Sequence, residues 1–383
     1  MAADRDEIYT LGIEEEYLLV DPDTRELAVD PPTDLLRDCE ALVPADIGTV
    51  SPEFLKPQIE VGTAVCANLG EARVRLSALR RAVVTAAEAH GYRVIAASTH
   101  PIADWHDTQH TDKARYNELA ADLQTVARRL LICGMHVHVG VDDDERRIDV
   151  MNQVSYFLPH LLALSTSSPF WQAQDTGLLS YRLSVFDELP RTGLPERFDS
   201  WGEYARHVGA LVGAGLIEDA SKIWWDARPS ARFPTVEMRI TDVCTTMEDS
   251  LTIAALFTCF VSMLTRLRRS NQRWRVYANM LINENRWRAQ RYGLSEGMVD
   301  FGKGEIVPFA TLLDEMIDLV GPDADMLGCR AEIEHARTIQ ARGTSAHRQL
   351  DAYRTAIGEG ADHTEALRRV VDWLIAETAA ATG

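Results

Sequence analysis

Charged residues stand inside three short stretches of the sequence whose other residues are mostly aliphatic. The three pairs, each two residues apart, are Glu14 and Glu16, His136 and His138, and Glu237 and Arg239. Residues two apart lie on the same face of a β-strand, so each pair should share one face of a sheet. Carboxylates held side by side in a sheet repel each other and lose hydration unless a cation compensates them. The pattern therefore predicts a cluster of metal ions lying on a β-sheet.

The predicted metal ligands come from separate strands. They are Glu14, Glu16, Glu60, His136 and Glu237, with Glu53 as a sixth candidate. A set made mostly of oxygen atoms suits Mg²⁺ or Mn²⁺ better than zinc. A single glutamate in a strand is usually a solvated edge residue, but five such residues on different strands are harder to explain in that way. Glu15 points to the opposite face by parity, and we expect it to have a structural role.

The His136 strand leaves two interpretations open. Either one imidazole binds metal and the other binds substrate, or both bind metal. Gly134 and Gly140 flank the pair, and the missing side chains would let a ligand or another backbone come close.

Arginines supply the second part of the predicted site. Arg239 shares a face with Glu237, an arrangement suited to phosphate, although the two could instead form a buried ion pair. Arg228 and Arg182 lie in loop-like contexts, where anion-binding guanidinium groups are often displayed. The Arg115-Tyr116 pair at the start of a helix could bind substrate or could be a surface pair. Because GxxxxGKS and GxGxxG motifs are absent, a nucleotide would be held by metal and arginine on the sheet.

Composition restricts the class of protein. The formal net charge of −19 argues against a non-specific nucleic-acid binder, which needs a basic surface. Six cysteines without a CxxC pair argue against a zinc ribbon or a disulfide framework, and a reducing cytoplasm fits this usage. The polar, acidic stretch Met1 to Glu7 is unlike a signal peptide. The apolar run Leu251 to Leu264 is too short to span a bilayer, so we expect a buried helix and no membrane partner.

The order of predicted elements favours an α+β fold in which helices cover a mainly antiparallel sheet. Strands are expected at Tyr9 to Val20, Phe54 to Val61, Arg93 to Ala97, around His136, and at Thr235 to Ile240. Helices are expected from Asn68 to His90, Asp112 to Leu131, Glu145 to Leu164 and Ser200 to Val212. From Thr245 onward the pattern is almost entirely helical, with breaks near Gly293, Gly321 and Gly343. We expect one catalytic domain over 1–383, with a sheet-rich part at 8–245 and a mainly helical part at 246–383.

Seven motifs in one order resemble those of the carboxylate-amine ligase family, also called glutamate-cysteine ligase type 2. They are Leu11 to Tyr17 (LGIEEEY), Phe54 to Glu60 (FLKPQIE), Ser98 to Pro101 (STHP), Gly134 to Gly140 (GMHVHVG), Trp225 to Ser230 (WDARPS), Thr235 to Arg239 (TVEMR) and Arg291 to Gly293 (RYG). The resemblance spans roughly Leu11 to Gly293.

This resemblance implies a glutamine-synthetase-like fold with a curved sheet whose concave face holds ATP and two or three Mg²⁺ or Mn²⁺ ions. It also implies that ATP phosphorylates a substrate carboxylate and that an amine attacks the acyl phosphate, giving an amide, ADP and phosphate. By motif position the metal ligands are Glu14, Glu16, Glu60, His136 and Glu237, with Glu53 added. Arg239 matches an arginine near the transferred phosphoryl group and Arg228 a nucleotide contact, with Lys56 as a further ATP contact. Arg182 is expected to bind the substrate α-carboxylate, with Arg115, Tyr116 and His138 nearby, and the catalytic residues are Arg239, Glu237 and His138.

One position departs from the family pattern. More distant glutamate-cysteine ligases commonly carry an amide-bearing residue where this chain has His138, so glutamate and cysteine are only default substrates. Two alternatives stay open, a phosphotransferase on the same sheet and a catalytically idle metal- or nucleotide-binding protein. A loop should close over the acyl phosphate to exclude water, either Leu189 to Pro195 or Ala103 to Thr111. The resemblance also suggests a homodimer.

Overall fold

The computed structural model describes residues 9–380, except for the side chains of Arg115, Glu118, Leu119 and Asp122. Its centre is a seven-stranded sheet in the order β10-β11-β5-β1-β3-β2, with β4 paired to the far end of β1. Every pairing in this sheet is antiparallel. The strands are β1 (Leu11–Val20), β2 (Gly48–Pro52), β3 (Gln58–Thr63), β4 (Arg93–Ile95), β5 (Met135–Gly140), β10 (Ala227–Pro229) and β11 (Thr235–Met238). The predicted α+β class with a mainly antiparallel sheet is therefore confirmed.

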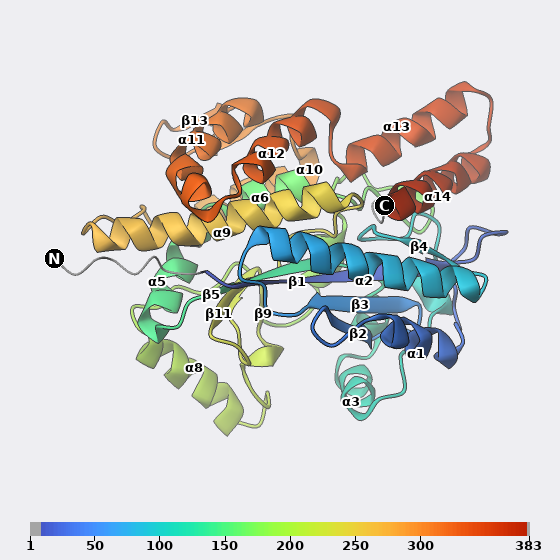
Figure 1. Cartoon of the computed structure of the whole chain (residues 1–383), viewed down its shortest axis with the longest axis horizontal. Helices are drawn as coiled ribbons and strands as arrows, with labels where there is room; N and C mark the ends of the chain where they lie inside the picture. Colours follow the sequence, from blue (N-terminus) through green and yellow to red (C-terminus); the bar gives the residue numbers. More distant parts are fainter. Residues whose placement is uncertain (1–8, 381–383) are drawn as a thin grey trace.

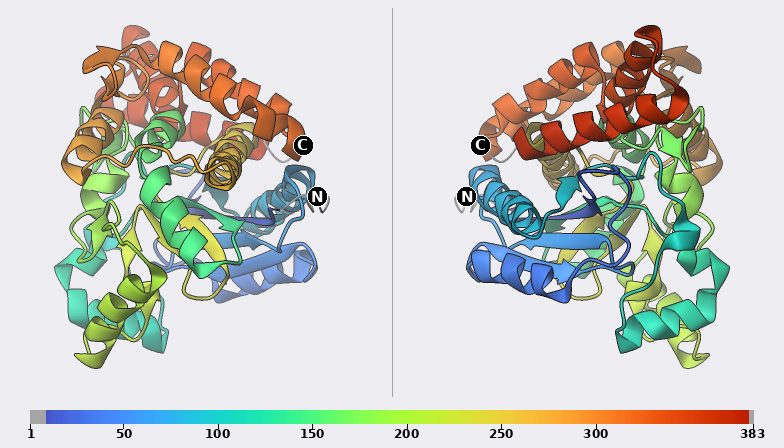
Figure 2. Two further views of the ribbon diagram at one scale, coloured as in Figure 1. Left: turned by 90° about the vertical axis from the view of Figure 1, so that its left-hand side faces the viewer. Right: turned by 90° about the vertical axis from the view of Figure 1, so that its right-hand side faces the viewer.

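Two long helices cover one face of the sheet. α2 (Leu69–Ala89) packs on β1, β3 and β4, and α9 (Met247–Arg269) packs on β5 and on α2. A further layer lies over α9 and extends beyond it, as both side views show (Figure 2). It contains α11 (Phe309–Leu327), α12 (Arg330–Arg342), α13 (Ser345–Gly358) and α14 (His363–Ala380). These helices lie on the same side of the sheet as α2 and α9, and α14 also packs directly on β4 (Figure 1).

Shorter elements surround the sheet and its other face. The helices are α1 (Thr33–Leu42), α3 (Ala114–Leu123), α4 (Thr125–Arg128), α5 (Asp144–Val154), α6 (Leu158–Ser165), α7 (Arg182–Phe186), α8 (Trp201–Gly213) and α10 (Asn279–Tyr292). The 3₁₀ turns are η1 (Trp105–Asp107) and η2 (Ala220–Lys222). Three two-stranded ribbons pair β6 (Phe170–Trp171) with β7 (Gln174–Asp175), β8 (Thr192–Gly193) with β9 (Trp224–Trp225), and β12 (Met298–Asp300) with β13 (Glu305–Val307).

Several predicted elements need correction. The expected helix Asp112 to Leu131 is broken at Gln124, whose φ of 50° is left-handed, and the expected helix Glu145 to Leu164 is broken before Pro159. A predicted break near Gly321 is wrong, because α11 continues through Gly321 and Pro322 and ends at Gly328 in a left-handed C-cap. The predictions also missed α1, β2 and the β12–β13 hairpin, whose short, mixed sequences carry little periodicity.

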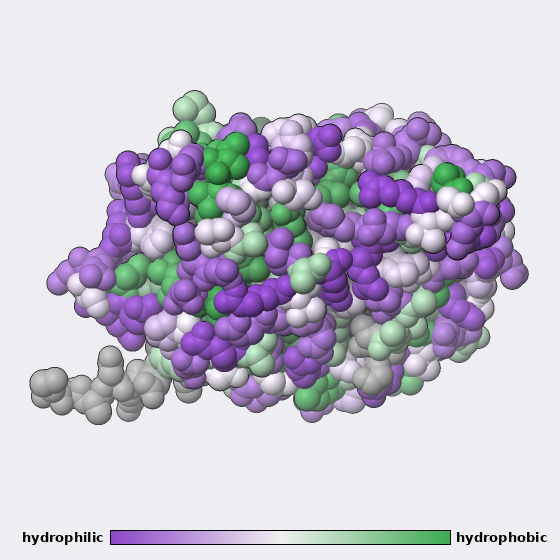
Figure 3. Space-filling model, turned by 90° about the horizontal axis from the view of Figure 1, so that it is seen from above, coloured by the Kyte–Doolittle hydropathy of each residue, from purple (hydrophilic) through white to green (hydrophobic). Residues whose placement is uncertain are grey.

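The apolar run Leu251 to Leu264 lies within α9, as the sequence predicted. Within the described chain, α9 is the one helix long and apolar enough to cross a membrane, but 89% of its apolar window is buried inside the protein. Seen from above, over the outer helices, the surface is mostly hydrophilic with separate hydrophobic spots (Figure 3). The burial of α9 is that of a core helix.

A buried ion pair fixes α2 and α9 against β1. Glu15 points from β1 toward these helices, and both of its oxygens bind Arg80 of α2, at 2.7 and 2.8 Å. Ser250 of α9 and the Tyr17 hydroxyl also donate to Glu15, and Arg80 donates to the carbonyls of Cys244 and Thr245. Glu15 and Arg80 are at most 1% exposed. The structural role predicted for Glu15 by strand parity matches this position.

Replacing Arg80 by methionine should destabilise the protein by about 3–5 kcal/mol, because it leaves Glu15 buried without a counter-charge. Denaturant unfolding measures this loss. The matched control is Arg81→Met at the neighbouring exposed position, which should change the free energy of unfolding by less than about 0.5 kcal/mol. Equal stabilities of the two variants would contradict the central role of this pair.

Candidate active site

The predicted site residues that belong to strands β1, β3, β5 and β11 lie on the sheet face opposite α2 and α9. In the β1–β5 register Glu14 stands opposite His136, and in the β1–β3 register Glu16 stands opposite Glu60. Glu237 of β11 stands opposite His138 of β5. Directly opposed residues on one face are close enough to interact. All of these side chains line one cavity of about 490 Å³.

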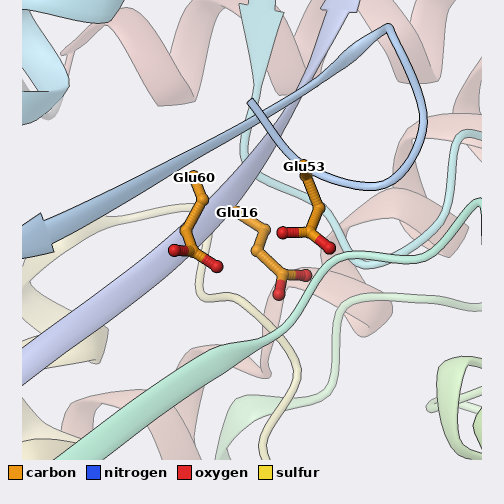
Figure 4. A group of neighbouring side chains, drawn as sticks. All are labelled: Glu16, Glu53 and Glu60. Carbon is orange, nitrogen blue, oxygen red and sulfur yellow. The ribbon is translucent and has the colours of Figure 1, made fainter. Parts of the chain in front are cut away.

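Three glutamates form an acidic cluster in this cavity. Glu16 of β1, Glu60 of β3 and Glu53 of the turn before β3 each offer a carboxylate oxygen within 4.8 Å of the others (Figure 4). Burial and the charge of Glu60 raise the pKa of Glu16 to about 7. Burial and the charge of Glu53 raise the pKa of Glu60 to about 8. A bound cation would relieve the repulsion among the three close carboxylates, and carboxylate oxygens suit a hard divalent cation, so these residues fit the predicted metal.

Glu14 of β1 contacts the two imidazoles of β5. Glu14 lies 3.2 Å from His136 Nδ1 and 3.5 Å from His138 Nε2. Although burial alone would raise the pKa of Glu14, these two imidazoles lower it well below its usual range. Burial and the charge of Arg239 lower the pKa of His136 to about 4, which keeps this imidazole neutral. A neutral imidazole is able to bind metal. The metal-ligand roles of His136 and Glu14 stay predictions.

Glu237 is held by two guanidinium groups. Arg228 forms a two-point pair with it at 2.9 and 3.1 Å, and Arg239 donates to its Oε1. Although burial would raise the pKa of Glu237, the charges of Arg239 and Arg228 lower it well below its usual range. The buried ion pair between Arg239 and Glu237, one of the two interpretations that the sequence allowed, is thus present. Among the described residues Glu237 stands outside the acidic cluster, and its metal role stays a prediction.

Arg182 is a buried guanidinium in the same cavity, only 2% exposed. It begins α7, lies over the Phe186 ring at 5.3 Å and donates to the carbonyl of Arg239 at 3.3 Å. Among the described residues its Nε meets no hydrogen-bond partner, which leaves a buried donor for an anion. A Cβ added at Gly134 would lie 2.3 Å from Arg182 Nη2, and the Gly134 amide donates to Glu16 at 2.7 Å. Gly134 therefore makes room for the guanidinium while its backbone holds a predicted ligand.

Not every predicted contact lies in the cavity. Lys56 is not among the lining residues, because its ammonium group binds Asp30 at 2.7 Å and Gln109 at 3.0 Å, so the structure does not support its predicted ATP contact. Tyr116 lines the cavity and its hydroxyl donates to the Pro52 carbonyl. The side chain of Arg115 lies outside the described residues. Of the two candidate closing loops, only Leu189 to Pro195 contributes a lining residue, Leu189.

Sequence reasoning also missed part of the cavity wall. Ser51 of β2 donates to Glu60 at 3.4 Å. The turn between β10 and β11 contributes Ser230, Ala231, Arg232 and Phe233, and two lysines also line the cavity, Lys113 and Lys222. These positions carry no strand or helix periodicity, but Ser230 is the last residue of the WDARPS motif, and the rest of the turn could have been included with it.

Two solved structures share this fold over almost the whole chain. The glutamate-cysteine ligase of Francisella tularensis, crystallised with AMP, has a TM-score of 0.66 at 14% identity, covering 98% of this chain and 91% of that one. The bifunctional glutathione synthetase of Pasteurella multocida has a TM-score of 0.65 at 14% identity, covering 97% of this chain and 52% of that one. At such identities the likeness defines the fold, which is that of the glutamate-cysteine ligases.

Sequence comparison defines the family. The model of glutamate-cysteine ligase family 2 (GCS2) matches residues 10–372. A Rhodospirillum rubrum protein with the provisional name glutamate-cysteine ligase 2 is 60% identical over 99% of this chain and 98% of its own length. A Jannaschia protein with the same provisional name is 55% identical over 97% of both chains. The chain belongs to glutamate-cysteine ligase family 2, which confirms the resemblance found in its motifs.

Glu53→Gln and Glu60→Gln should leave the melting temperature of the metal-free protein unchanged or raised, because each removes one of three mutually repelling carboxylates. Both should lose most of the stabilisation by Mn²⁺, which for a bound ion at 100 times its Kd is about 2.7 kcal/mol. Thermal unfolding with and without Mn²⁺ measures both effects. Glu284→Gln, at an exposed position of α10, is the control and should respond to Mn²⁺ like the wild type. A large loss of metal-free stability would instead mean that the cluster is structural.

Proposed function

We propose that this protein is an ATP-dependent carboxylate-amine ligase that forms an amide through an acyl phosphate. The observation that carries the proposal is the cavity itself, where an acidic cluster of Glu16, Glu53 and Glu60 lies beside the buried guanidinium groups of Arg182 and Arg239. Family membership over residues 10–372 and the names of the relatives agree with this reaction.

The reaction has two steps in this proposal. A carboxylate oxygen attacks the γ-phosphorus of ATP and ADP leaves. The amine nitrogen then attacks the acyl carbon and phosphate leaves, while the amine loses a proton. Phosphorylation is required because hydroxide is a poor leaving group, and both steps bring negative charges together.

The residues of the cavity have separate proposed tasks. Glu16, Glu53 and Glu60 would hold Mg²⁺ or Mn²⁺, which when bound neutralises charge on the nucleotide phosphates. Arg239 would stabilise charge on the transferred phosphoryl group, and Arg228 fixes the Glu237 carboxylate to which Arg239 donates. Arg182, whose Nε finds no hydrogen-bond partner in the described part of the chain, would bind the carboxylate of the amino-acid substrate. His138 lies between Glu14 and Glu237, where it can contact the amine.

Incubating the protein with ATP, Mg²⁺ and a panel of carboxylate and amine pairs should release ADP and form amide in equal amounts for at least one pair. Coupled ADP detection with mass detection of the amide tests this. ADP release with a phosphorylated acceptor and no amide would support the phosphotransferase alternative. Background ADP release with every pair would support the idle binding protein and overturn the proposal.

Gly134→Ala should raise the KM for the carboxylate substrate tenfold or more, because the added methyl group displaces the Arg182 guanidinium. Arg182→Ala should have the same direction and a larger effect. The matched control is Gly209→Ala on the exposed side of α8, where a Cβ meets nothing within 4 Å, and its kinetics should equal those of the wild type. Unchanged substrate affinity in both site variants would contradict the role of Arg182.

A further inference from the structure

Arg286 of α10 is a buried guanidinium that joins two carboxylates behind the cavity. It donates to Asp226 at 2.7 and 3.2 Å and to Asp187 at 2.7 and 2.8 Å. Its side chain is 8% exposed and is not among those lining the cavity. A planar guanidinium that forms two-point bonds with two carboxylates fixes their relative position more strictly than a single ammonium could.

One of the two carboxylates belongs to the segment that holds Arg239. Asp226 lies between β9 and β10, and its backbone carbonyl accepts the amides of Arg239 at 2.8 Å and Ile240 at 3.1 Å. Its own amide donates to Gly193 of β8 at 2.8 Å. Holding the Asp226 side chain therefore fixes the point where the chain leaves β11 and presents Arg239 to the cavity.

The other carboxylate ends the short helix that begins with Arg182. Asp187 is the C-cap of α7, and its amide donates to the Leu183 carbonyl at 2.9 Å. A helix of five residues has little stability of its own and needs tertiary contacts. α10 also holds the segment that precedes α7, because the Gln290 carbonyl accepts the amides of Leu179 at 2.7 Å and Ser180 at 3.2 Å.

We propose that Arg286 is a positioning residue that sets the distance between Arg182 and Arg239, and so between the substrate carboxylate and the transferred phosphoryl group. This inference rests on the proposed function for the roles of those two arginines. Arg286 itself touches neither substrate, and it acts through Asp187 on Arg182 and through Asp226 on Arg239.

Three variants separate the two branches of this network. Arg286→Lys keeps the positive charge but loses the two-point hydrogen bonds of the guanidinium, and kcat/KM should fall tenfold to a hundredfold. Asp187→Asn should chiefly raise the KM for the carboxylate substrate, because it loosens Arg182. Asp226→Asn should chiefly lower kcat, because it loosens Arg239. The control is Arg288→Lys on the same helix, whose guanidinium binds the backbone carbonyls of Gly297 and Glu296 and whose loss should leave both constants unchanged.

The outcome distinguishes positioning from simple stabilisation. If the three variants melt at lower temperature but keep wild-type kcat and KM where folded, Arg286 is structural and the inference is overturned. Asp187 is partly exposed, so Asp187→Asn should fold even if Arg286→Lys does not.

If the wild type forms no amide with any pair, the proposed function fails, and Arg286 is then tested by calorimetric binding of Mn²⁺-ATP. Arg286→Lys should raise that Kd at least tenfold over Arg288→Lys, and equal values overturn the inference.

Discussion

Three consecutive glutamates on β1 are the constraint around which the rest of the structure is arranged. Alternation along a strand sends Glu15 to one face of the sheet and Glu14 and Glu16 to the other. Each carboxylate is poorly hydrated and needs a positive partner. On the helix-covered face Arg80 of α2 supplies that partner from within the fold. On the cavity face the fold supplies positive partners for only part of the negative charge. One face of β1 therefore stabilises the fold, and the other face is available for chemistry.

Strand register determines which residues of the neighbouring strands lie on the cavity face. Glu14 opposite His136, Glu16 opposite Glu60 and Glu237 opposite His138 place charged residues of four strands on one face. A slip of one residue would turn Glu14 and Glu16 toward α2 and α9, where Arg80 can neutralise a single carboxylate. The antiparallel register and the buried Glu15–Arg80 pair therefore enforce the same arrangement. Gly134 keeps space open for the Arg182 guanidinium on this crowded face.

The sequence was most informative where alternation forced a residue to one face. Parity alone gives the shared face of Glu14 and Glu16 and the separate place of Glu15, whereas the observed strand register brings Glu60, His136 and Glu237 to the same face. Contacts decided by the tertiary path were less predictable. Lys56 stands next to the Glu60 strand in the sequence, yet Asp30 and Gln109 draw its ammonium away from the cavity. Arg286 sits in an ordinary helical pattern, and nothing in that pattern reveals that Asp187 and Asp226 meet at its guanidinium.

The charges of the cavity also explain how a strongly acidic protein could admit a polyanion. The chain carries a formal net charge of −19, which alone would repel a triphosphate. Charges farther than about 8 Å are largely screened at physiological ionic strength, so the residues of the cavity matter most. There the basic side chains Lys113, Arg182, Lys222, Arg228, Arg232 and Arg239 accompany the glutamates. Arg228 and Arg239 already neutralise Glu237, while burial and the neighbouring carboxylates raise the pKa values of Glu16 and Glu60 in the acidic cluster. The cavity thus has arginine-rich walls near β10 and β11 and an acidic cluster near β1 and β3, so an incoming anion would meet cationic groups on one side and the proposed metal ion on the other.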